Sequence, residues 1–373
     1  MCNCYLETNL DRLEQNIKNI KKQYQTPVKV MCVLKANAYG HGISEIAKFL
    51  DHSQEADMFA VANAYEAMEL REAGIRKHIL VLSGVSQESL EHLIPESVRL
   101  TVSDMKEAKR IQETADRLNR TAFVHIKIDT GMHRIGFIPD VDFVQNQLKT
   151  IASMDHVKME GIMSHFANSD EPDSAYQKKQ YDLFIHILNQ CKDCGIHYDI
   201  THISNSAASL TSPSYQTDMI RLGIAMYGYN PFGKGLPNTL NIKPCASMYA
   251  RINHIKTLPK GSYISYGLKY KTSEESVIAT VSAGYADGFP RFLTNNYEVK
   301  IKDRYAPVCG TVCMDQFMID ITGIDNVKVG DYVMLFGDDP SGKCTVDTIA
   351  EKGNTIIYEI LCNINDRVKR IYK

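Results

Sequence analysis

One pattern repeats along the first part of the chain and limits the folds open to it. Short apolar runs rich in β-branched residues alternate with polar or amphipathic stretches, which predicts buried strands separated by helices. The runs occupy residues 28–34, 58–62, 79–83, 99–102, 122–128, 157–164, 199–204 and 219–227. Eight strand-and-helix units in this length are typical of an α/β fold, the (β/α)8 barrel of the TIM type.

A doubly wound open sheet is a second possible arrangement of the same units. The first apolar run is not followed by a G-x-G-x-x-G segment, which counts against a dinucleotide-binding version of that sheet. Helices are predicted between the strands from capping residues and amphipathic spacing. They are a first helix from Asn9 or Asp11 to about Tyr24, then 64–73, 106–118 and 174–194.

The chain changes character after Asn230. Turn-forming residues mark a linker, namely Pro231, Gly233, Gly235 and Pro237. Beyond about residue 247 the helical pattern largely ends, and short strand-like runs follow at 278–281, 298–301 and 332–336. These runs predict a mostly antiparallel β domain. We expect a barrel domain over residues 10–240 and a β domain over residues 241–373. An N-terminal strand within residues 1–9 is expected to be part of the β domain.

Charge and cysteine usage narrow the partners. The 373 residues carry a net charge of −2, which supplies no field for nucleic acid or an anionic membrane. We therefore expect small molecules or other protein subunits as partners. Ten cysteines without framework spacing indicate reduced thiols, so a cytoplasmic protein or the cytoplasmic domain of a membrane protein is expected. The pair Cys191 and Cys194 lacks a second ligand pair, so no metal site is expected.

Unusual polar residues and one Gly-Ile pair follow the apolar runs, at the end of the strands where a TIM-type barrel carries its chemistry. They are Lys35, Tyr39, Lys127, Asp129, Thr130, Arg134, His165, Asn205, Ser206, Arg221, Gly223 and Ile224. Lys35 ends a buried run, and an amine that loses its solvent becomes neutral and can form a Schiff base with a carbonyl. Taken alone, this lysine could equally be a structural residue that reaches solvent from a strand end.

A phosphate site is expected after the last barrel strand. Gly223 and Ile224 could open a short helix whose N–H groups bind a phosphate. Ser206 and Tyr39 could add hydroxyl donors. A phosphate at one end and a Schiff-base lysine at the other suggest pyridoxal phosphate, with His165 against its ring.

Arg221 indicates what such a cofactor would be used for. An arginine is always cationic, so beside the pyridine nitrogen it would leave that nitrogen unprotonated and weaken electron withdrawal. This favours rapid removal and return of a proton over chemistry that needs a long-lived carbanion.

Six segments resemble motifs of the alanine racemase family. They are residues 33–42, 129–136, 221–224, 264–267, 283–288 and 312–315. The likeness runs from about residue 5 to the end of the chain. It implies a pyridoxal-phosphate barrel followed by a β domain, and an isomerase that interconverts L- and D-alanine to supply peptidoglycan synthesis.

The resemblance also implies a two-base mechanism. Lys35 would carry the cofactor and act as the base on the D face, and Tyr266 would be the base on the L face. Two bases on opposite faces are what inversion at Cα needs. Tyr266 is expected from the other subunit of a head-to-tail homodimer, in which each β domain covers the partner's barrel mouth. His165 and Arg221 would support the tyrosine.

Further roles follow from the same resemblance. Arg134 and the backbone N–H of Met314 would hold the substrate carboxylate. Lys127 lies at a position that is often carbamylated in this family, where it would orient Arg134. The cofactor contacts implied are Lys35, Tyr39, His165, Asn205, Ser206, Arg221, Gly223 and Ile224.

One departure leaves the substrate open. Asp366 stands where some family members have a tyrosine near the phosphate. A more open, polar pocket would admit a hydroxymethyl side chain, as in the serine racemase domains of vancomycin-resistance membrane proteins.

Two further functions share part of this pattern. A fold-related pyridoxal-phosphate decarboxylase would have the barrel, the lysine and the β domain. The motifs around Tyr266 and Met314 in this chain resemble those of racemases, which counts against a decarboxylase. A cofactor carrier without enzymatic activity would need no β domain, so the segment from 247 to 373 counts against it.

Overall fold

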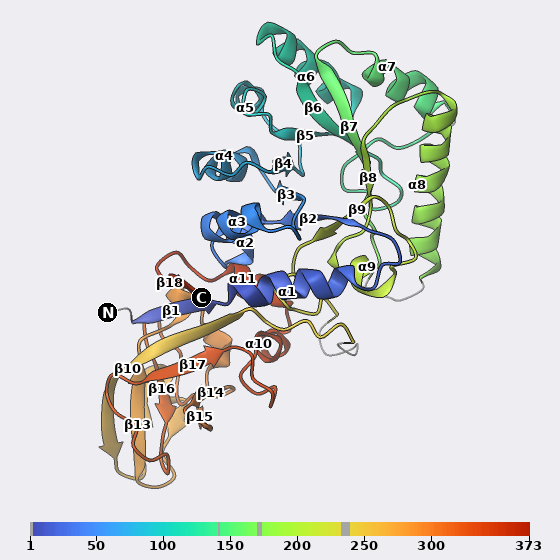
Figure 1. The fold of residues 1–373 in the computed structure, drawn as a ribbon. Coiled ribbons are helices and arrows are strands. Elements are labelled where there is room, and N and C mark those ends of the chain that lie inside the picture. The colour runs from blue at the N-terminus through green and yellow to red at the C-terminus, as the bar shows by residue number, and fades with distance from the viewer. Residues whose placement is uncertain (1–2, 141, 170–173, 233–238) are drawn as a thin grey trace.

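Eight parallel strands close into a barrel in this computed structural model, which describes residues 3–140, 142–169, 174–232 and 239–373. They are β2 (Lys29–Val33), β3 (Met58–Val61), β4 (His78–Val81), β5 (Arg99–Val102), β6 (Ala122–Lys127), β7 (Val157–Met163), β8 (Ile200–His202) and β9 (Met219–Leu222). Because β9 pairs with β2, the sheet has no open edge (Figure 1). The predicted TIM-type barrel is therefore confirmed, and the doubly wound sheet is excluded.

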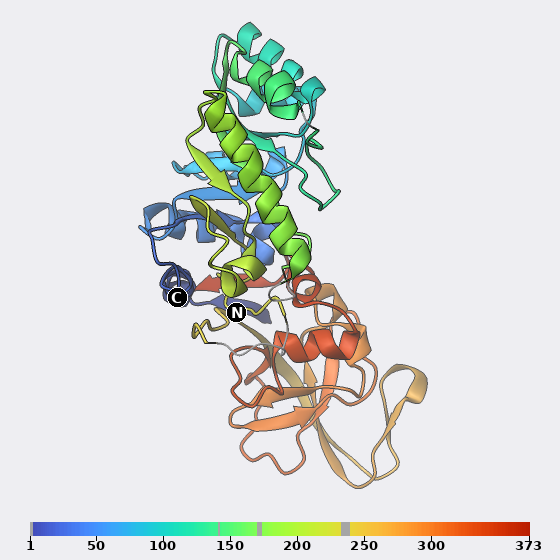
Figure 2. The same cartoon turned by 90° about the vertical axis from the view of Figure 1, so that its right-hand side faces the viewer.

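The strands are apolar because parallel strands in a barrel are covered on both faces. Every residue of β3, β5, β8 and β9 is buried. Helices cover the outside of the barrel (Figures 1 and 2). They are α1 (Leu10–Lys21), α3 (Ile43–His52), α4 (Ala64–Glu72), α5 (Gln87–Leu93), α6 (Met105–Arg117), η1 (Val144–Leu148), α7 (Lys149–Ala152), α8 (Ala175–Asp193) and α9 (Ser206–Thr211). The segment labelled α2 (Lys35–Tyr39) follows β2 and is a left-handed turn.

Side-chain caps start several of these helices where the sequence predicts them. The Asn9 side chain accepts a hydrogen bond from the Arg12 N–H at 2.8 Å and begins α1. Asn63 and Asp104 cap α4 and α6 in the same way. Such a cap satisfies an N–H group that has no partner inside the helix, so local contacts help to set where these helices begin.

The rest of the chain forms a second sheet that lies against one end of the barrel domain (Figures 1 and 2). Its strand order is β15-β14-β17-β10-β1-β18, with β13 paired to β10 and β16 paired to β13. The strands are β1 (Cys4–Thr8), β10 (Ala246–Leu258), β13 (Ser276–Val281), β14 (Glu298–Ile301), β15 (Arg304–Pro307), β16 (Phe317–Asp320), β17 (Tyr332–Phe336) and β18 (Lys369–Tyr372). All pairs are antiparallel except β1 with β18, so the mostly antiparallel β domain is confirmed. A small hairpin, β11 (Tyr263–Ile264) and β12 (Tyr270–Lys271), stands apart.

This domain also contains two helices that were not predicted from the sequence, α10 (Val346–Gly353) and α11 (Ile357–Cys362). The Thr345 side chain caps α10, but α11 is too short to show a helical period. Among the linker residues, Pro231 is described, whereas Gly233, Gly235 and Pro237 lie outside the described residues. No helix in the described ranges has the length and apolar character needed to cross a membrane.

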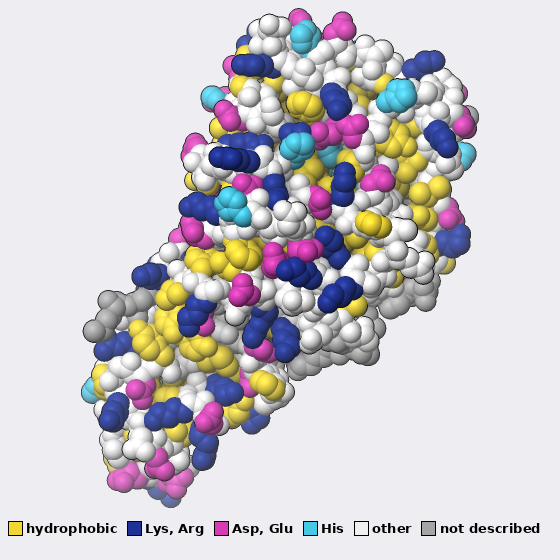
Figure 3. All heavy atoms as spheres, in the orientation of Figure 1, with side chains coloured by type: hydrophobic (Ala, Val, Ile, Leu, Met, Phe, Trp, Pro, Cys, Tyr) yellow, Lys and Arg dark blue, Asp and Glu magenta, His cyan; other side chains and the backbone are white. Residues whose placement is uncertain are grey.

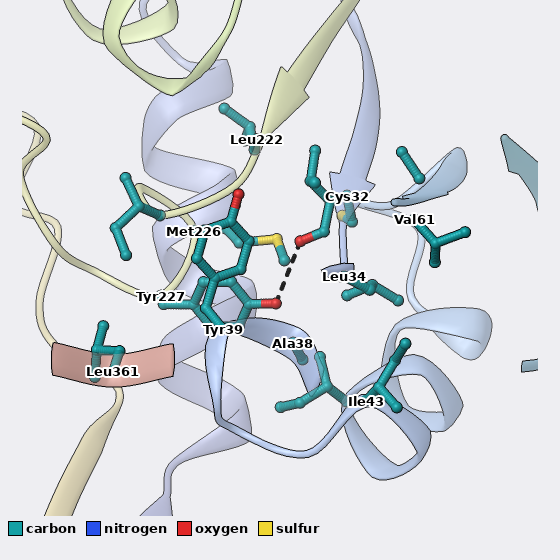
Figure 4. Packing of buried hydrophobic residues seen from close by; sticks show 14 of the residues in the cluster. Cys32, Leu34, Ala38, Tyr39, Ile43, Val61, Leu222, Met226, Tyr227 and Leu361 are labelled. Carbon is teal, nitrogen blue, oxygen red and sulfur yellow. Dashed lines mark hydrogen bonds between the residues drawn. The ribbon is translucent and has the colours of Figure 1, made fainter. Parts of the chain in front are cut away.

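One hydrophobic core joins the barrel to the end of the chain. Figure 4 shows Tyr39 and Tyr227 packed among residues of the barrel, with Leu361 of α11 at the edge of the same cluster. The Tyr227 hydroxyl donates to the Val33 carbonyl at 3.4 Å. On the face in Figure 3, acidic and basic side chains are interspersed over both domains.

The two domains approach each other closely at Gly40, just after α2. A Cβ atom added here would lie 2.1 Å from the Leu361 carbonyl oxygen. Gly40 also has φ +80, a left-handed conformation that favours glycine. The turn after β2 and helix α11 are therefore fitted to each other through a residue without a side chain.

We predict that Gly40→Ala destabilises the protein more than Gly74→Ala. Gly74 has nearly the same φ, +83, but a Cβ there would meet nothing within 4 Å. Gly74→Ala should cost about 1–2 kcal/mol from its backbone conformation alone, whereas Gly40→Ala adds the clash with α11. Thermal unfolding of both variants measures the difference, and equal melting temperatures would contradict the interdomain contact.

Candidate active site

A cavity of about 400 Å³ opens at the carboxyl ends of the barrel strands. Ten residues that the sequence places at this rim line it together: Lys35, Tyr39, Lys127, Arg134, His165, Asn205, Ser206, Arg221, Gly223 and Ile224. The remaining two rim residues, Asp129 and Thr130, are buried beside it. Asp129 accepts hydrogen bonds from the N–H groups of Gly131 and His133 at 2.9 and 3.0 Å, which folds the loop that leads to Arg134.

Lys35 reaches this cavity from an unusual left-handed turn. The four residues after it, 36–39, all have φ of +53 or +54 although none is glycine. Each such residue costs about 1–2 kcal/mol relative to a right-handed conformation, so the surroundings must hold the turn. Glu66 accepts from the Ala36 N–H at 2.7 Å, and Arg370 of β18 donates to the Gly40 carbonyl at 3.1 and 3.2 Å. The turn is thus held from both domains.

The Lys35 amine makes no hydrogen bond or ion pair with any described residue. Burial lowers its pKa, and the positive charge of Arg134 lowers it further. A lysine in this environment presents a neutral amine more readily than one in water, as attack on a carbonyl requires.

Lys127 is more deeply placed. Its side chain is buried, and its Nζ donates to the Ile128 carbonyl at 3.2 Å. Burial, followed by the charge of Arg221, lowers the pKa of Lys127 to about 7. Two lysine amines in one cavity are therefore shifted toward the neutral form.

Arg221 on β9 is buried at the floor of the cavity. Its guanidinium donates to His202 Nδ1 at 2.7 Å, to His165 Nδ1 at 2.8 Å, and to the carbonyls of Ser164 and Ile203 at 2.9 Å. Because arginine only donates, both imidazoles must offer a lone pair at Nδ1. Burial and the charge of Arg221 lower the pKa of His165 well below its usual value, so the neutral ring carries its proton on Nε2.

The segment after β9 is a turn and not the short helix expected from the sequence. It is held by Ser206, whose Oγ accepts from the N–H groups of Gly223 and Ala225 at 2.9 and 3.4 Å. A Cβ on Gly223 would lie 2.3 Å from the Tyr39 hydroxyl oxygen. The Tyr39 hydroxyl itself bonds to no described residue. The hydroxyl groups of Ser206 and Tyr39 therefore both lie against Gly223, which has no side chain to exclude them.

Asn205 lines the cavity but also has a structural task. Its Oδ1 caps α9 by accepting from the Ala208 N–H at 2.9 Å, and it accepts from the Ser169 hydroxyl at 2.9 Å. Asn205 thus fixes the start of the helix that presents Ser206.

Charge is the dominant property of this cavity. Its lining includes four basic side chains and, among the described residues, no acidic one: Lys35, Lys127, Arg134 and Arg221. A neutral amine, hydroxyl donors and cationic groups suit a small ligand with a carbonyl and two anionic groups. The donor set therefore fits pyridoxal phosphate together with an amino-acid carboxylate.

Tyr266 and Met314 line a different cavity, of about 780 Å³, in the β domain. Tyr266 begins a short helical turn, η3 (Tyr266–Leu268), and is 74% exposed. The Thr311 hydroxyl donates to the Tyr266 carbonyl at 2.7 Å, and the Met314 N–H donates to no described residue. Within one chain, the structure therefore does not bring Tyr266 or Met314 into the cavity of Lys35.

One aromatic residue of the Lys35 cavity was not predicted from the sequence. Tyr358 comes from α11, and no sequence motif marks a residue that the end of the chain contributes to the barrel. Asp366 does not line the cavity. Its side chain is 92% exposed, and it accepts a hydrogen bond from Asn37 at 3.4 Å. Across the described ranges, no group of three or more His, Cys, Asp or Glu is arranged to hold a metal ion.

Family models match almost the whole chain. The model of the alanine racemase N-terminal domain covers residues 8–231, and that of the alanine racemase C-terminal domain covers residues 245–372. The two matched segments correspond to the barrel and to the β domain that follows it.

Similar proteins and structures agree with the family models. The alanine racemase of Methanococcus maripaludis is 40% identical over 368 residues, which are 99% of this chain and 98% of that protein. The alanine racemase of Halothermothrix orenii is 42% identical over 371 residues, which are 99% of this chain and 96% of that protein. The solved structure of alanine racemase from Clostridium difficile 630 matches with a TM-score of 0.94 and 40% identity, covering 100% of this chain and 96% of that one. The barrel, the β domain and the motifs they carry thus place the chain in the alanine racemase family.

Proposed function

We propose that the chain is a pyridoxal-phosphate-dependent alanine racemase. The observation that carries the proposal is the cavity lined by four basic side chains and, among the described residues, no acidic one, with Lys35 at its mouth. Relatives named alanine racemase support it, as does a related structure described as a complex with cycloserine. We further propose that the product D-alanine serves peptidoglycan synthesis.

Pyridoxal phosphate, when bound, supplies the electron withdrawal that makes the Cα–H bond of an amino acid acidic. Lys35 would hold the cofactor through its amine. The hydroxyls of Tyr39 and Ser206, with the turn at Gly223 and Ile224, would hold the phosphate. The remaining proposed contacts are His165, Asn205 and Arg221.

Inversion at Cα needs a proton acceptor on each face of the substrate. Lys35 takes or returns the proton on the D face. Tyr266 does so on the L face and must come from a second subunit, because it lines a separate cavity in its own chain. We therefore propose a head-to-tail homodimer in which the β domain of one chain covers the barrel mouth of the other.

The neighbouring residues hold the charges that this reaction needs. His165 carries its proton on Nε2, since Arg221 occupies Nδ1, so it can donate to the phenolic oxygen of the partner's Tyr266 and favour loss of that proton. Arg134 and the N–H of the partner's Met314 would bind the substrate carboxylate. Each contact is an N–H donor meeting an anionic oxygen, which is the stronger class of hydrogen bond.

The first test is racemisation of L-alanine, and of L-serine in parallel, with chiral analysis of the products. Serine is the comparison substrate because the sequence leaves the substrate side chain open, but Asp366 does not line the cavity and so does not widen it. We expect alanine to react faster. Lys35→Ala should abolish activity and the visible absorbance of bound cofactor, whereas Lys29→Ala, on the exposed start of the same strand, should retain both. An active Lys35→Ala enzyme would contradict the proposal.

The second test is Tyr266→Phe, which removes the proposed base on the L face. Loss of the Cα proton in deuterium oxide should slow far more from L-alanine than from D-alanine, because Lys35 still serves the D face. Tyr263→Phe, at an exposed tyrosine of the same β-domain cavity, is the matched control and should change neither rate. Equal slowing for both enantiomers would contradict the assignment of two bases.

Mixing variants tests where the two bases come from. Dimers that combine a Lys35→Ala chain with a Tyr266→Phe chain should contain one site with both intact residues, provided that the partner supplies the tyrosine. Activity should therefore reappear on mixing. If each chain supplied both of its own residues, mixed dimers would contain no intact site.

We also propose that Lys127 is carbamylated. Its neutral amine attacks carbon dioxide, an N–C bond forms and one N–H proton leaves to water, so that a carbamate anion replaces the amine beside Arg134. Because its pKa is lowered to about 7, the neutral fraction rises between about pH 6 and about pH 8. A carbamate signal in ¹³C NMR with labelled bicarbonate should grow over this range and vanish in Lys127→Ala. A signal that survives this substitution would contradict the assignment.

A further inference from the structure

A line of buried polar side chains runs through the barrel, away from the cavity. Arg221 on β9 contacts His202 on β8, which contacts His125 on β6, and the line ends at Glu160 on β7. The interior of such a barrel is normally filled by branched apolar side chains, and a buried polar group is costly unless it is hydrogen-bonded. Each member of this line is hydrogen-bonded to the next, so none of these buried polar groups is left without a partner.

The hydrogen bonds of this line all point the same way. Arg221 donates to His202 Nδ1 at 2.7 Å, so the neutral His202 ring carries its proton on Nε2. That proton is donated to His125 Nδ1 at 2.8 Å. The His125 ring in turn donates from Nε2 to Glu160 Oε2 at 3.2 Å. Every donor faces an acceptor only when both imidazoles are neutral and each is protonated at Nε2.

Arg221 has no carboxylate of its own. In the described part of the chain, no Asp or Glu lies within ion-pair distance of its guanidinium, whose other acceptors are carbonyls and His165. Burial lowers the pKa of both His202 and His125, which keeps them neutral. Glu160 is therefore the carboxylate at the far end of the hydrogen bonds that begin at Arg221.

The far end of the line is anchored by Arg99 on β5. Its Nε and Nη2 donate to the two oxygens of Glu160 at 2.9 Å each. Its remaining group, Nη1, donates to the Ser97 carbonyl at 2.7 Å, and the guanidinium lies 4.6 Å from the centre of the Phe123 ring. Nη2 also lies 3.0 Å from His78 Nε2. Glu160 cannot turn away from His125 without breaking this fork.

The backbone makes room for the line. A Cβ on Gly161 would lie 2.5 Å from His125 Nδ1, so only glycine admits the ring. The pairing of β6 with β7 also shifts register between Val124 and His125, and such irregularities re-aim a side chain. Two strands therefore depart from regular structure at the place where His125 connects His202 to Glu160.

We propose that Glu160 is a positioning residue of the active site, which holds the Arg221 guanidinium in its working orientation through His125 and His202. The line orients and does not conduct protons, because arginine does not give up its proton in this range. This inference rests on the proposed function, since the orientation of Arg221 matters to catalysis only if the cavity holds the cofactor and its substrate.

The test compares Glu160→Met with Glu160→Gln. Methionine removes the oxygen that accepts the hydrogen bond from His125, so the His125 and His202 rings no longer hold Arg221 in one orientation. We expect kcat for alanine to fall about tenfold, which is the effect of losing one hydrogen bond in a charged network. KM should change by less than about twofold, because carboxylate binding by Arg134 is untouched. Glutamine should recover most of kcat, since its oxygen can face His125 while Arg99 Nη2 turns to His78.

Imidazole ¹⁵N NMR gives a readout that does not depend on activity. In the wild-type protein, with and without cofactor, His125 and His202 should each show a protonated Nε2 and a bare Nδ1. Glu160→Met should abolish this single state at His125, and Glu160→Gln should keep it. Wild-type signals that show another tautomer, or no change in Glu160→Met, would overturn the proposal even if the enzyme racemises alanine. A wild-type protein with the expected tautomers and no racemisation would contradict only the proposed function.

Two further variants separate positioning from stability. Arg99→Lys keeps the charge beside Glu160 but loses the two-pronged contact that holds it. Because Glu160 still offers an acceptor to His125, this variant should lower the melting temperature and reduce kcat by less than Glu160→Met does. Gly161→Ala should displace His125 and lower kcat as Glu160→Met does, which preserves the test if the methionine variant does not fold. If Glu160→Met and Arg99→Lys lowered stability equally and left kcat at the wild-type value, the line would be structural only.

Discussion

Desolvation of basic side chains is the constraint on which this site depends, and the repulsion between them adds to it. Barrel closure places Lys35, Lys127, Arg134 and Arg221 around one cavity that has no carboxylate among the described residues of its lining. Burial is the main cause that lowers the pKa of Lys35 and Lys127, and the charges of Arg134 and Arg221 lower it further, so both amines lose a proton more readily than in water. The arginines retain theirs. Burial, together with repulsion, thus leaves the cavity with two amines available for covalent chemistry and two permanent cations available for anions.

The second requirement is a backbone that holds Lys35 at the edge of this field. The left-handed residues 36–39 have no glycine to relieve them, so contacts from elsewhere hold the turn in place. Glu66 of the barrel contributes one such contact, and Arg370 and Tyr372 at the end of the chain donate to the carbonyls of Gly40 and His41. The barrel domain therefore cannot present its reactive amine fully without the β domain of the same chain.

The barrel and the residues that line the Lys35 cavity from its strand ends could be predicted from the sequence. Apolar runs predict strands wherever burial is periodic, and Lys35, His165 and Arg221 stand out because they follow such runs. Tyr358 could not be found, because its place against the barrel depends on contacts made more than three hundred residues along the chain from β2. The left-handed turn was equally hidden, since its residues have no local preference for that conformation.

His125 and Glu160 show a different limit of sequence reasoning. They lie inside strands, where a polar residue only interrupts the apolar run that predicts the strand. Their contact with each other becomes visible only in the closed barrel. An apolar interior would be the more stable filling for a barrel of this kind. Arg221 excludes an entirely apolar interior, because a buried guanidinium needs hydrogen-bond acceptors. A neutral imidazole that accepts from Arg221 also carries an N–H group, which needs an acceptor in turn. The polar line is therefore the consequence of placing an arginine, and not a carboxylate, at the centre of the site, and it ends only where Glu160 and Arg99 neutralise each other.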